Sequence, residues 1–542
     1  MTTIDTRTEH GAFSLSGTQA GSGGLAALTG WITTADHKRI GRLLIGSSLL
    51  FGAATFVLTA LLGLERMDQN GSVLDAGSVG QLFALERVAL PFMAAVPLLL
   101  GLAVAVVPLQ LGARGLAFGR AAAFGFWTWL LGSALVVASF IGNGGPGGGD
   151  SKMVDLFLVS LGITLVGLLV IAGTVATTVL TSRAPGMTLQ RVPGLAWASL
   201  VGSVALLVTV PVLIADLVLL GVDHKYVRTP GFGANLDLLG WMGWGLSQPA
   251  TIAYSLIALG VVADVVTTAS HRRSTLRPVF LVGVAVAATA VLGAVTQKVQ
   301  LLEWNGDAGS KIQDLLPWAL FHLLPILGPV LVLAVCGQAL AAGKIAKVSP
   351  AALGFSVLGL ALVALGTAAQ ALTPIVELDL LGTTYEEGAA TLILGGAILA
   401  GLGGLIHWAP KLWGRALPAG ATLPLAGLGA LGVALAGLPL LIAGFQGQPA
   451  MAGSGFDYDL APEVLNLLVL VGGAALALTV VGVIALAVTS LVGEPTAGDD
   501  PYDGQTLEWA TTSPAPADNF AEVPRVASAE PLFDLKPGRS DA

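Results

Sequence analysis

The residues of this chain that could bind a transition metal are few and scattered. Imidazole and sulfur are the side-chain groups that such metals prefer in apolar surroundings. The sequence contains six histidines, one cysteine and seven methionines. Four of the histidines, His10, His37, His224 and His271, are predicted to lie in tails or loops. A metal centre inside the apolar part of the chain would therefore depend on the two histidines that remain.

These two histidines are His322, in "WALFHLLPI", and His407, in "LIHWAPK". They fall in different apolar stretches and near opposite ends of the predicted helices, so they are too far apart to share a metal. Cys336 alone cannot form an intrachain disulfide or a cysteine cluster, and the methionines show no clustered spacing. We therefore interpret both histidines as hydrogen-bonded or interfacial side chains.

Charged residues at the ends of apolar stretches form the second group of residues that could take part in chemistry. They are Glu86 and Arg87, Lys298, and the pair Glu386 and Glu387. A charge at the centre of a bilayer costs about 2.5–3.5 kcal/mol, so such side chains usually pair or line water. Two interpretations remain open: a buried ion-pair network or water-filled pocket, and side chains that are solvated next to loops.

The elements that must position these residues are membrane helices. The mean hydropathy is +0.83, and only 11% of the residues are charged. An apolar stretch needs about 20 residues to cross a bilayer as a helix, which satisfies its own backbone hydrogen bonds. Stretches of this kind are predicted at 43–64, 88–110, 123–142, 155–180, 196–221, 245–268, 279–298, 317–341, 352–374, 388–409, 417–444 and 464–492. The sequence therefore predicts an all-α membrane protein with a bundle of twelve transmembrane helices.

The tails and the charge distribution complete the predicted layout. Residues 1–30 are expected to form a flexible tail, 31–492 the membrane domain, and 493–542 a second, largely disordered tail rich in Pro, Asp and Ala. Most of the 25 Lys and Arg residues fall in alternate loops and in the tails, which predicts that both termini are cytoplasmic. The net charge of −8 gives no reason to expect nucleic-acid binding.

Five stretches resemble subunit I of haem–copper oxidases, particularly the bacterial cytochrome c oxidase type. They are "TTADHKRIG" (33–41), "VVPLQLGARGLAFGR" (106–120), "SRAPGMTLQRVP" (182–193), "WAPKLWGR" (408–415) and "TLEWATTSPAPADNF" (506–520). They occur in the order of the family and span nearly the whole chain. The resemblance implies the twelve-helix fold, a bacterial plasma membrane location, two haems and one copper ion.

The residues that would hold these cofactors are replaced in this sequence. The resemblance places the haem ligands at Glu86, Ala389 and Thr391, and the copper ligands at Gln248, Gln297 and Lys298. None of these side chains is a usual ligand of haem iron or of copper in such a site. We therefore expect no bound cofactor, no metal site and no catalytic residue.

Three functions follow as hypotheses. The first is a non-catalytic relative, or pseudoenzyme, that serves as a structural, regulatory or assembly subunit of a respiratory complex, with membrane lipid and other respiratory subunits as partners. The second is a functional terminal oxidase that couples oxygen reduction to proton translocation, as the resemblance alone implies. The third is a proton or ion conduit built from the buried charges. The first is favoured because the motifs that remain shape surfaces, whereas the residues that are lost perform the chemistry.

A specific arrangement of the charges follows from the family layout. Two helices that grip a haem from opposite sides in the family can close on each other here. We therefore expect Arg87 to lie within ion-pairing distance of Glu386 or Glu387, with Glu86 or Lys298 extending the cluster.

Overall fold

The structure is a computed structural model that describes residues 29–535 apart from short gaps. The gaps are 68–73, 75, 146–147, 228–249, 297–299, 306–307, 344, 346–347, 452–461, 493 and 524. Residues 29–32 form one helical turn in a unit of their own that ends at Thr34. The predicted flexible tail, 1–30, lies outside the described residues except for its last two positions.

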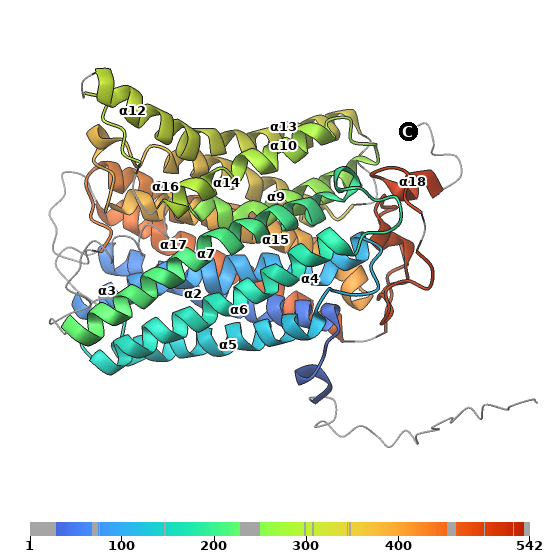
Figure 1. Ribbon diagram of the computed structural model, residues 1–542, viewed down its shortest axis with the longest axis horizontal. Helices are drawn as coiled ribbons and strands as arrows, with labels where there is room; N and C mark the ends of the chain where they lie inside the picture. The colour runs from blue at the N-terminus through green and yellow to red at the C-terminus, as the bar shows by residue number, and fades with distance from the viewer. Residues whose placement is uncertain are drawn as a thin grey trace, which may run out of the picture. The chain divides into compact units, whose positions relative to one another are not determined.

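The second unit, from Ala35 onward, is built of long helices that lie side by side (Figure 1). In chain order they are α2 (His37–Met67), α3 (Ala76–Ala89), α4 (Val96–Gln110), α5 (Gly119–Ile141), α6 (Ser151–Thr181), α7 (Gly194–Val227), α9 (Ala250–Ser270), α10 (Arg277–Ala287), α11 (Ala290–Val295), α12 (Ala308–Trp318), α13 (Leu327–Ala342), α14 (Pro350–Gln370), α15 (Thr384–Trp413), α16 (Ala419–Phe445) and α17 (Pro462–Leu491). A π-helical turn, η1 (Leu90–Ala95), joins α3 to α4.

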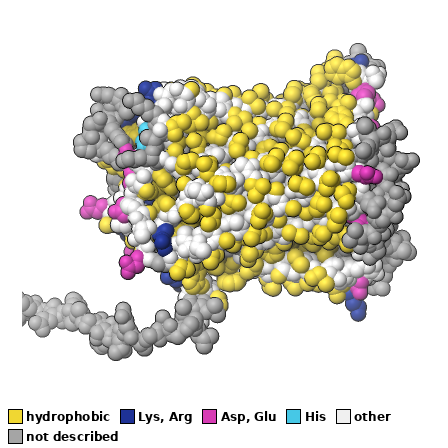
Figure 2. Space-filling view, turned by 180° about the vertical axis from the view of Figure 1, so that it is seen from behind, with side chains coloured by type: hydrophobic (Ala, Val, Ile, Leu, Met, Phe, Trp, Pro, Cys, Tyr) yellow, Lys and Arg dark blue, Asp and Glu magenta, His cyan; other side chains and the backbone are white. Residues whose placement is uncertain are grey.

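Twelve helical segments of the described chain are long and apolar enough to cross a membrane. The twelve-helix prediction is therefore confirmed, with α3–η1–α4, α10–α11 and α12–α13 each forming one span. The surface agrees with this assignment, because apolar side chains cover its middle while charged side chains gather at the two ends (Figure 2). The protein is a multi-pass membrane protein.

Two spans form the centre of the bundle. The span α3–η1–α4 and the span α15 are wholly buried, whereas most other spans bury only about half of their residues. Helix α15 packs directly on η1, α4, α9, α14 and α16. Its sequence, "TLILGGAILAGLGGLIHW", carries glycines on several sides, and small residues allow such close approach between membrane helices.

One glycine pair shows how close this approach is. A Cβ atom added to Gly359 of α14 would lie 2.5 Å from the carbonyl oxygen of Gly396 in α15, and one added to Gly396 would lie 2.6 Å from that of Gly359. Any larger residue at either position would force the two helices apart. Glycine is therefore required for this contact.

The segment after α17 is packed, which corrects the expectation of a largely disordered tail. It contains the short helices η6 (Leu507–Ala510) and α18 (Pro531–Leu535), and its described residues pack against the end of the bundle. Leu507, Trp509, Val526 and Phe533 are buried among the apolar ends of the helices. The composition of the tail is polar, but these few apolar side chains and many hydrogen bonds to the helix ends hold it in place.

Candidate functional site

Two groups of buried polar side chains lie at opposite ends of α15. The first, which we call the α2–α15 cluster, consists of Thr59, Arg66, Glu86 and Glu387. The second, which we call the tail cluster, consists of Gln110, Asp264, Trp408 and Glu508. Glu387 and Trp408 are separated by a helical rise of about 30 Å, so the two clusters are distinct sites.

An ion pair between the first and tenth spans is the centre of the α2–α15 cluster. Arg66 Nη1 donates to Glu387 Oε1 at 3.2 Å, and Nη2 lies 3.0 Å from Oε2. Nη2 also donates to the carbonyl oxygen of Ala450. The Arg66 and Glu387 side chains are only 1% and 2% exposed, so the pair is desolvated on both sides.

Glu86 of α3 extends the cluster. Its side chain is buried, and Thr59 Oγ1 donates to its Oε1 at 3.2 Å. Glu387, Arg87 and Arg66 act on it electrostatically. Thus the predicted buried ionic cluster contains Glu86 and Glu387, but its central cation is Arg66, which we did not predict.

The other predicted members take different places. Arg87 is half-buried on the side of α3 next to Glu86, and among the ion pairs of the described residues Glu387 pairs with Arg66 rather than with Arg87. The prediction for that pair is corrected, because a helix turns about 100° per residue and Glu86 occupies the inward position. Glu386 is half-buried, and its Oε2 accepts from the Gly382 amide at 3.3 Å. Lys298 lies outside the described residues.

The former haem positions do not fit a haem. Glu86, Ala389 and Thr391 are at most 2% exposed, and a cavity large enough for a porphyrin would leave the side chains around it accessible. Haem iron takes an axial His, Met, Cys or Tyr, none of which stands at these positions. The oxygen atoms here without a hydrogen-bond partner among the described residues are Thr391 Oγ1 and Glu86 Oε2, which are not in that donor set.

Protein side chains occupy the space between the two central spans. Leu98 of α4 packs against Gly401 of α15, and Leu102 packs against Gly404. In η1, Phe92 and Met93 are completely buried, and the Phe92 ring meets Tyr254 edge to face at 5.1 Å. Interiors of proteins are packed at high density, and these large side chains provide that density here. The predicted copper positions, Gln248, Gln297 and Lys298, lie outside the described residues.

The tail cluster joins the ends of three spans to the C-terminal segment. Gln110 Nε2 donates to Asp264 Oδ2 at 2.7 Å and to Glu508 Oε1 at 3.1 Å. The Trp408 indole donates to the same Glu508 oxygen at 3.3 Å. The first amides of α7, at 194 and 195, donate to Asp264 at 2.8 and 2.9 Å. Two buried carboxyl groups are therefore bridged by one amide.

Further contacts clamp the tail to the helix ends. Lys411 Nζ donates to the carbonyl oxygens of Asp499, Thr511 and Thr512 at 2.9, 2.7 and 3.3 Å. The Asn519 side chain lies 3.1 Å from His37 Nε2 and donates to the Ala113 carbonyl oxygen at 2.8 Å.

The histidines take the following places. His37 is the buried first residue of α2, and His224 lies in the last turn of α7, which corrects their placement in tails or loops. His271 does lie in a turn. His322 bonds Gln300 at 3.1 Å, as expected of a hydrogen-bonded histidine, and His407 stacks on Tyr502 at 5.1 Å.

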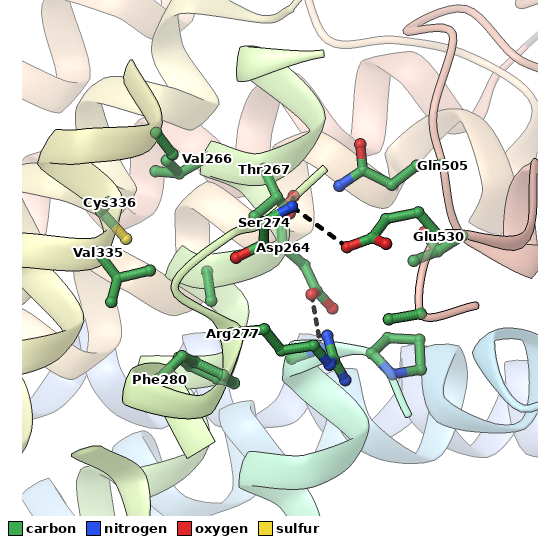
Figure 3. A pocket seen from close by; sticks show the side chains of 16 residues that line it. Asp264, Val266, Thr267, Ser274, Arg277, Phe280, Val335, Cys336, Gln505 and Glu530 are labelled. Atoms are coloured by element: carbon green, nitrogen blue, oxygen red, sulfur yellow. Dashed lines mark hydrogen bonds between the residues drawn. The ribbon is translucent and has the colours of Figure 1, made fainter. Parts of the chain in front are cut away.

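A small cavity of about 30 Å³ lies beside the tail cluster (Figure 3). Asp264, Arg277, Gln505 and Glu530 line it from α9, α10 and the tail. The amide of Ser274 donates to Glu530 Oε1 at 3.4 Å, which ties the tail to the turn between α9 and α10. The cavity has the volume of about one or two water molecules, so it cannot accept an organic substrate.

Two carboxyl groups of the tail, Glu508 and Glu530, have raised pKa values. Burial, together with the neighbouring charge of Asp264, raises the pKa of Glu508 to about 7. Burial also raises the pKa of Glu530, against the lowering effect of Arg277. Glu508 is therefore partly protonated near neutral pH, so its charge depends on small changes in pH or packing.

The sequence contained some signals for the residues that we did not predict. Gln110 and Glu508 stand inside the two motifs "VVPLQLGARGLAFGR" and "TLEWATTSPAPADNF". Since both motifs mark segments next to the predicted membrane surface, their joint occurrence could have suggested a contact. Arg66 lies just beyond the predicted apolar stretch, and Asp264 is a single charge in an apolar run.

Comparisons with known proteins identify the class. The chain has the fold of a solved haem–copper terminal oxidase dimer, with a TM-score of 0.65 and 13% identity over 84% of this chain and 85% of that one. The family model described as cytochrome c and quinol oxidase polypeptide I matches residues 39–301.

Similar curated proteins cover most of the chain. The chain is 27% identical to cytochrome c oxidase subunit 1 of Alkalihalophilus pseudofirmus, over 93% of this chain and 82% of the relative. It is 29% identical to a putative cytochrome c oxidase subunit 1-beta of Streptomyces coelicolor, over 94% and 91%. The chain is thus similar over most of its length to subunit I of haem–copper oxidases.

Proposed function

We propose that this protein is a non-catalytic, subunit I-like component of a respiratory complex, with a structural, regulatory or assembly role. The observation that carries the proposal is the closed centre of the bundle at Glu86, Ala389 and Thr391, where the side chains are buried and none is a haem ligand. The Arg66–Glu387 ion pair supports it, because it ties α15 to α2 beside the buried Glu86 at this closed end of the bundle.

The partners in this proposal are membrane lipid and other respiratory subunits. The curated relatives are named as subunits of cytochrome c oxidase, which supports a multi-subunit assembly. The tail and the start of α2 lie at one end of the bundle, since Asn519 contacts His37 and Lys38. Together with the Lys and Arg bias of the loops, this contact supports a plasma-membrane protein with both termini in the cytoplasm.

A functional oxidase is the main alternative, and it is what the names of the relatives suggest. A proton conduit is less well supported, because α4 between the two clusters presents only buried apolar residues from Leu98 to Val107. A conduit needs titratable or hydrated groups along its path.

The decisive experiment is an absorption spectrum and a metal analysis of the purified protein. Cytochrome c oxidase subunit 1 of Bacillus subtilis, expressed and purified in the same way, serves as the positive control. We expect no Soret band, no stoichiometric copper and no oxygen consumption with a reduced donor. A Soret band with low-spin features in the wild-type protein would overturn the proposal.

A double variant tests whether packing, in addition to ligand loss, closes the site. Glu86→His with Thr391→His restores imidazoles at two of the former haem positions. Since the side chains at Glu86, Ala389 and Thr391 are already buried by their neighbours, we expect this variant to bind no haem as well. Haem uptake by the double variant would show that the centre of the bundle opens readily, contrary to the closed packing.

The orientation is tested by cysteine labelling. Arg525→Cys places a thiol in the tail, and the native Cys336 is buried and gives little background. A membrane-impermeant maleimide should label this variant only in inside-out vesicles. Labelling in right-side-out vesicles would contradict the cytoplasmic placement of the tail.

A further inference from the structure

A groove of about 430 Å³ opens on the apolar surface between α2, the end of α15 and the end of α17. Its volume is in the range of about 300–1,000 Å³ that is typical of small-molecule sites. Leu50 of α2 and Ile484 of α17 line one end. The other end is lined by Arg42 and Leu491, which lie eight and seven residues away on the same two helices, a rise of about 10–12 Å. The groove is therefore elongated, apolar and parallel to the helices.

The other end of the groove is polar and positively charged. Arg42 and Trp413 line it together with Leu491, the last residue of α17. Asp36 and Arg39 both lie within electrostatic range of Arg42, and Asp36 is itself paired with Lys38 at 3.1 Å. Arg415 donates to the carbonyl oxygen of Val492, directly after α17. The Arg42 guanidinium thus lines one mouth of an otherwise apolar groove, and Arg39 and Arg415 lie close to the same helix ends.

Part of the half-buried indole ring of Trp413 lines this mouth. Its Nε1–H is buried and has no hydrogen-bond partner among the described residues. Tryptophan and arginine are also the residues that mark the interface between the hydrocarbon core and the headgroups. The position of this mouth, at the ends of three membrane spans, places it at that level.

We infer that the groove binds one anionic phospholipid of the surrounding bilayer. The phosphate group lies at Arg42, since the planar guanidinium matches phosphate geometry. An acyl chain lies along the apolar part of the groove toward Leu50. The positive charge at the mouth selects an anionic over a zwitterionic headgroup. The inference is independent of the proposed function, since it concerns the membrane-facing surface only.

The groove offers a variant that blocks it without disturbing the core. Gly46 lines the groove, and a Cβ atom added there meets nothing within 4 Å. Gly46→Leu therefore fills the groove while leaving the helix contacts intact. Gly162→Leu on α6 is the matched control, because a Cβ atom there also meets nothing within 4 Å and the residue is not part of the groove.

Native mass spectrometry of the full chain, titrated with phosphatidylglycerol or phosphatidylcholine in detergent, tests the inference. We expect one tightly bound phosphatidylglycerol in the wild-type protein and weaker binding of phosphatidylcholine. Arg42→Gln should weaken phosphatidylglycerol binding about fivefold and reduce the preference between the two lipids. Arg272→Gln, at the turn after α9, is the control for charge and should change neither value.

Trp413→Phe keeps an aromatic ring but reduces the surface that lines the mouth, so it should weaken binding by a smaller factor than Arg42→Gln. Gly46→Leu should abolish the tight binding, whereas Gly162→Leu should retain it. Equal binding of the two lipids by the wild-type protein would overturn the inference, as would unchanged binding in both Arg42→Gln and Gly46→Leu. Size-exclusion profiles identify any variant that misfolds, and Trp413→Phe then provides the test.

Discussion

The two ends of α15 differ in what they share with the family. At the end that contains Glu387, an ion pair to Arg66 joins α15 to α2, and neither residue belongs to a family-like motif. At the end that contains Trp408, residues from two family-like motifs, Gln110 and Glu508, meet directly. The comparison shows that residues of two family-like motifs meet at one end of α15, whereas residues outside those motifs make the main contact at the other end.

The largest effect is expected from removing one partner of the Arg66–Glu387 pair. Arg66→Ala leaves Glu387 buried without its cation, and such a loss typically costs about 3–5 kcal/mol. Thermal unfolding in detergent, followed by circular dichroism, measures the change. Glu386→Ala is the matched control, because Glu386 is half-buried and its loss should cost less than about 1 kcal/mol.

The double variant Arg66→Met with Glu387→Leu sharpens this comparison. It removes both charges and retains most of the side-chain volume, so its stability should lie closer to that of the wild type than that of Arg66→Ala. If Arg66→Ala unfolds at the same temperature as the wild type, the pair is not a desolvated link between the spans.

The second effect concerns the pH dependence of tail docking. The pKa of Glu508 is raised to about 7 in the folded protein, from an ordinary value of 4.5. Protonated Glu508 therefore favours docking: this contribution is complete below pH 4.5 and is lost as the pH rises through about 7. The loss amounts to at most about 3 kcal/mol.

Hydrogen exchange of residues 505–520 at several pH values measures this effect. Protection should decrease between pH 5 and pH 8 in the wild type, and the decrease should be smaller in Glu508→Gln. Glu522→Gln, at an exposed position of the same tail, should behave like the wild type. A decrease in protection that Glu508→Gln leaves unchanged would assign the pH dependence to another group.

The smallest effect is expected at the edge of the tail. Arg273 Nη2 lies 2.6 Å from Asp534 Oδ1, and the two side chains are 30% and 28% exposed. Hydrogen bonds from Ser528 and Arg273 hold the pKa of Asp534 below its ordinary value, although burial opposes this. Asp534→Asn should therefore weaken docking of α18 by about 1 kcal/mol or less, seen as faster exchange of residues 528–535 only. An effect on residues 505–520 would show that the edge of the tail controls the whole segment.

The fold was predictable because it depends on local properties of the sequence. Each apolar stretch is long enough to span a bilayer, and a helix is the only structure that such an isolated stretch can adopt there. The α2–α15 cluster was predictable in part, since Glu86 and Glu387 are charges next to apolar runs. Its cation was not, because Arg66 and Glu387 are separated by 321 residues and no local pattern connects them.

The tail shows a different limit of the sequence. Its Pro- and Asp-rich composition is typical of segments that cannot bury enough apolar surface to fold alone. The bundle supplies the missing surface, because buried Lys411 and the end of α4 offer partners for backbone carbonyls and for Asn519. Composition describes the segment itself and contains no information about the surface on which it docks.

The contact between Asn519 and His37 also constrains the order of assembly. The two residues are 482 positions apart, so the start of the first span lacks this partner until nearly the whole chain has been synthesised. At about 5–20 residues per second, ribosomal synthesis of that length takes about 25–100 s. During this time the buried end of α2 must be shielded by the insertion machinery, by lipid headgroups or by water. A residue near the C-terminal end thus completes the packing around the start of the first span, which is among the first parts of the chain to be synthesised.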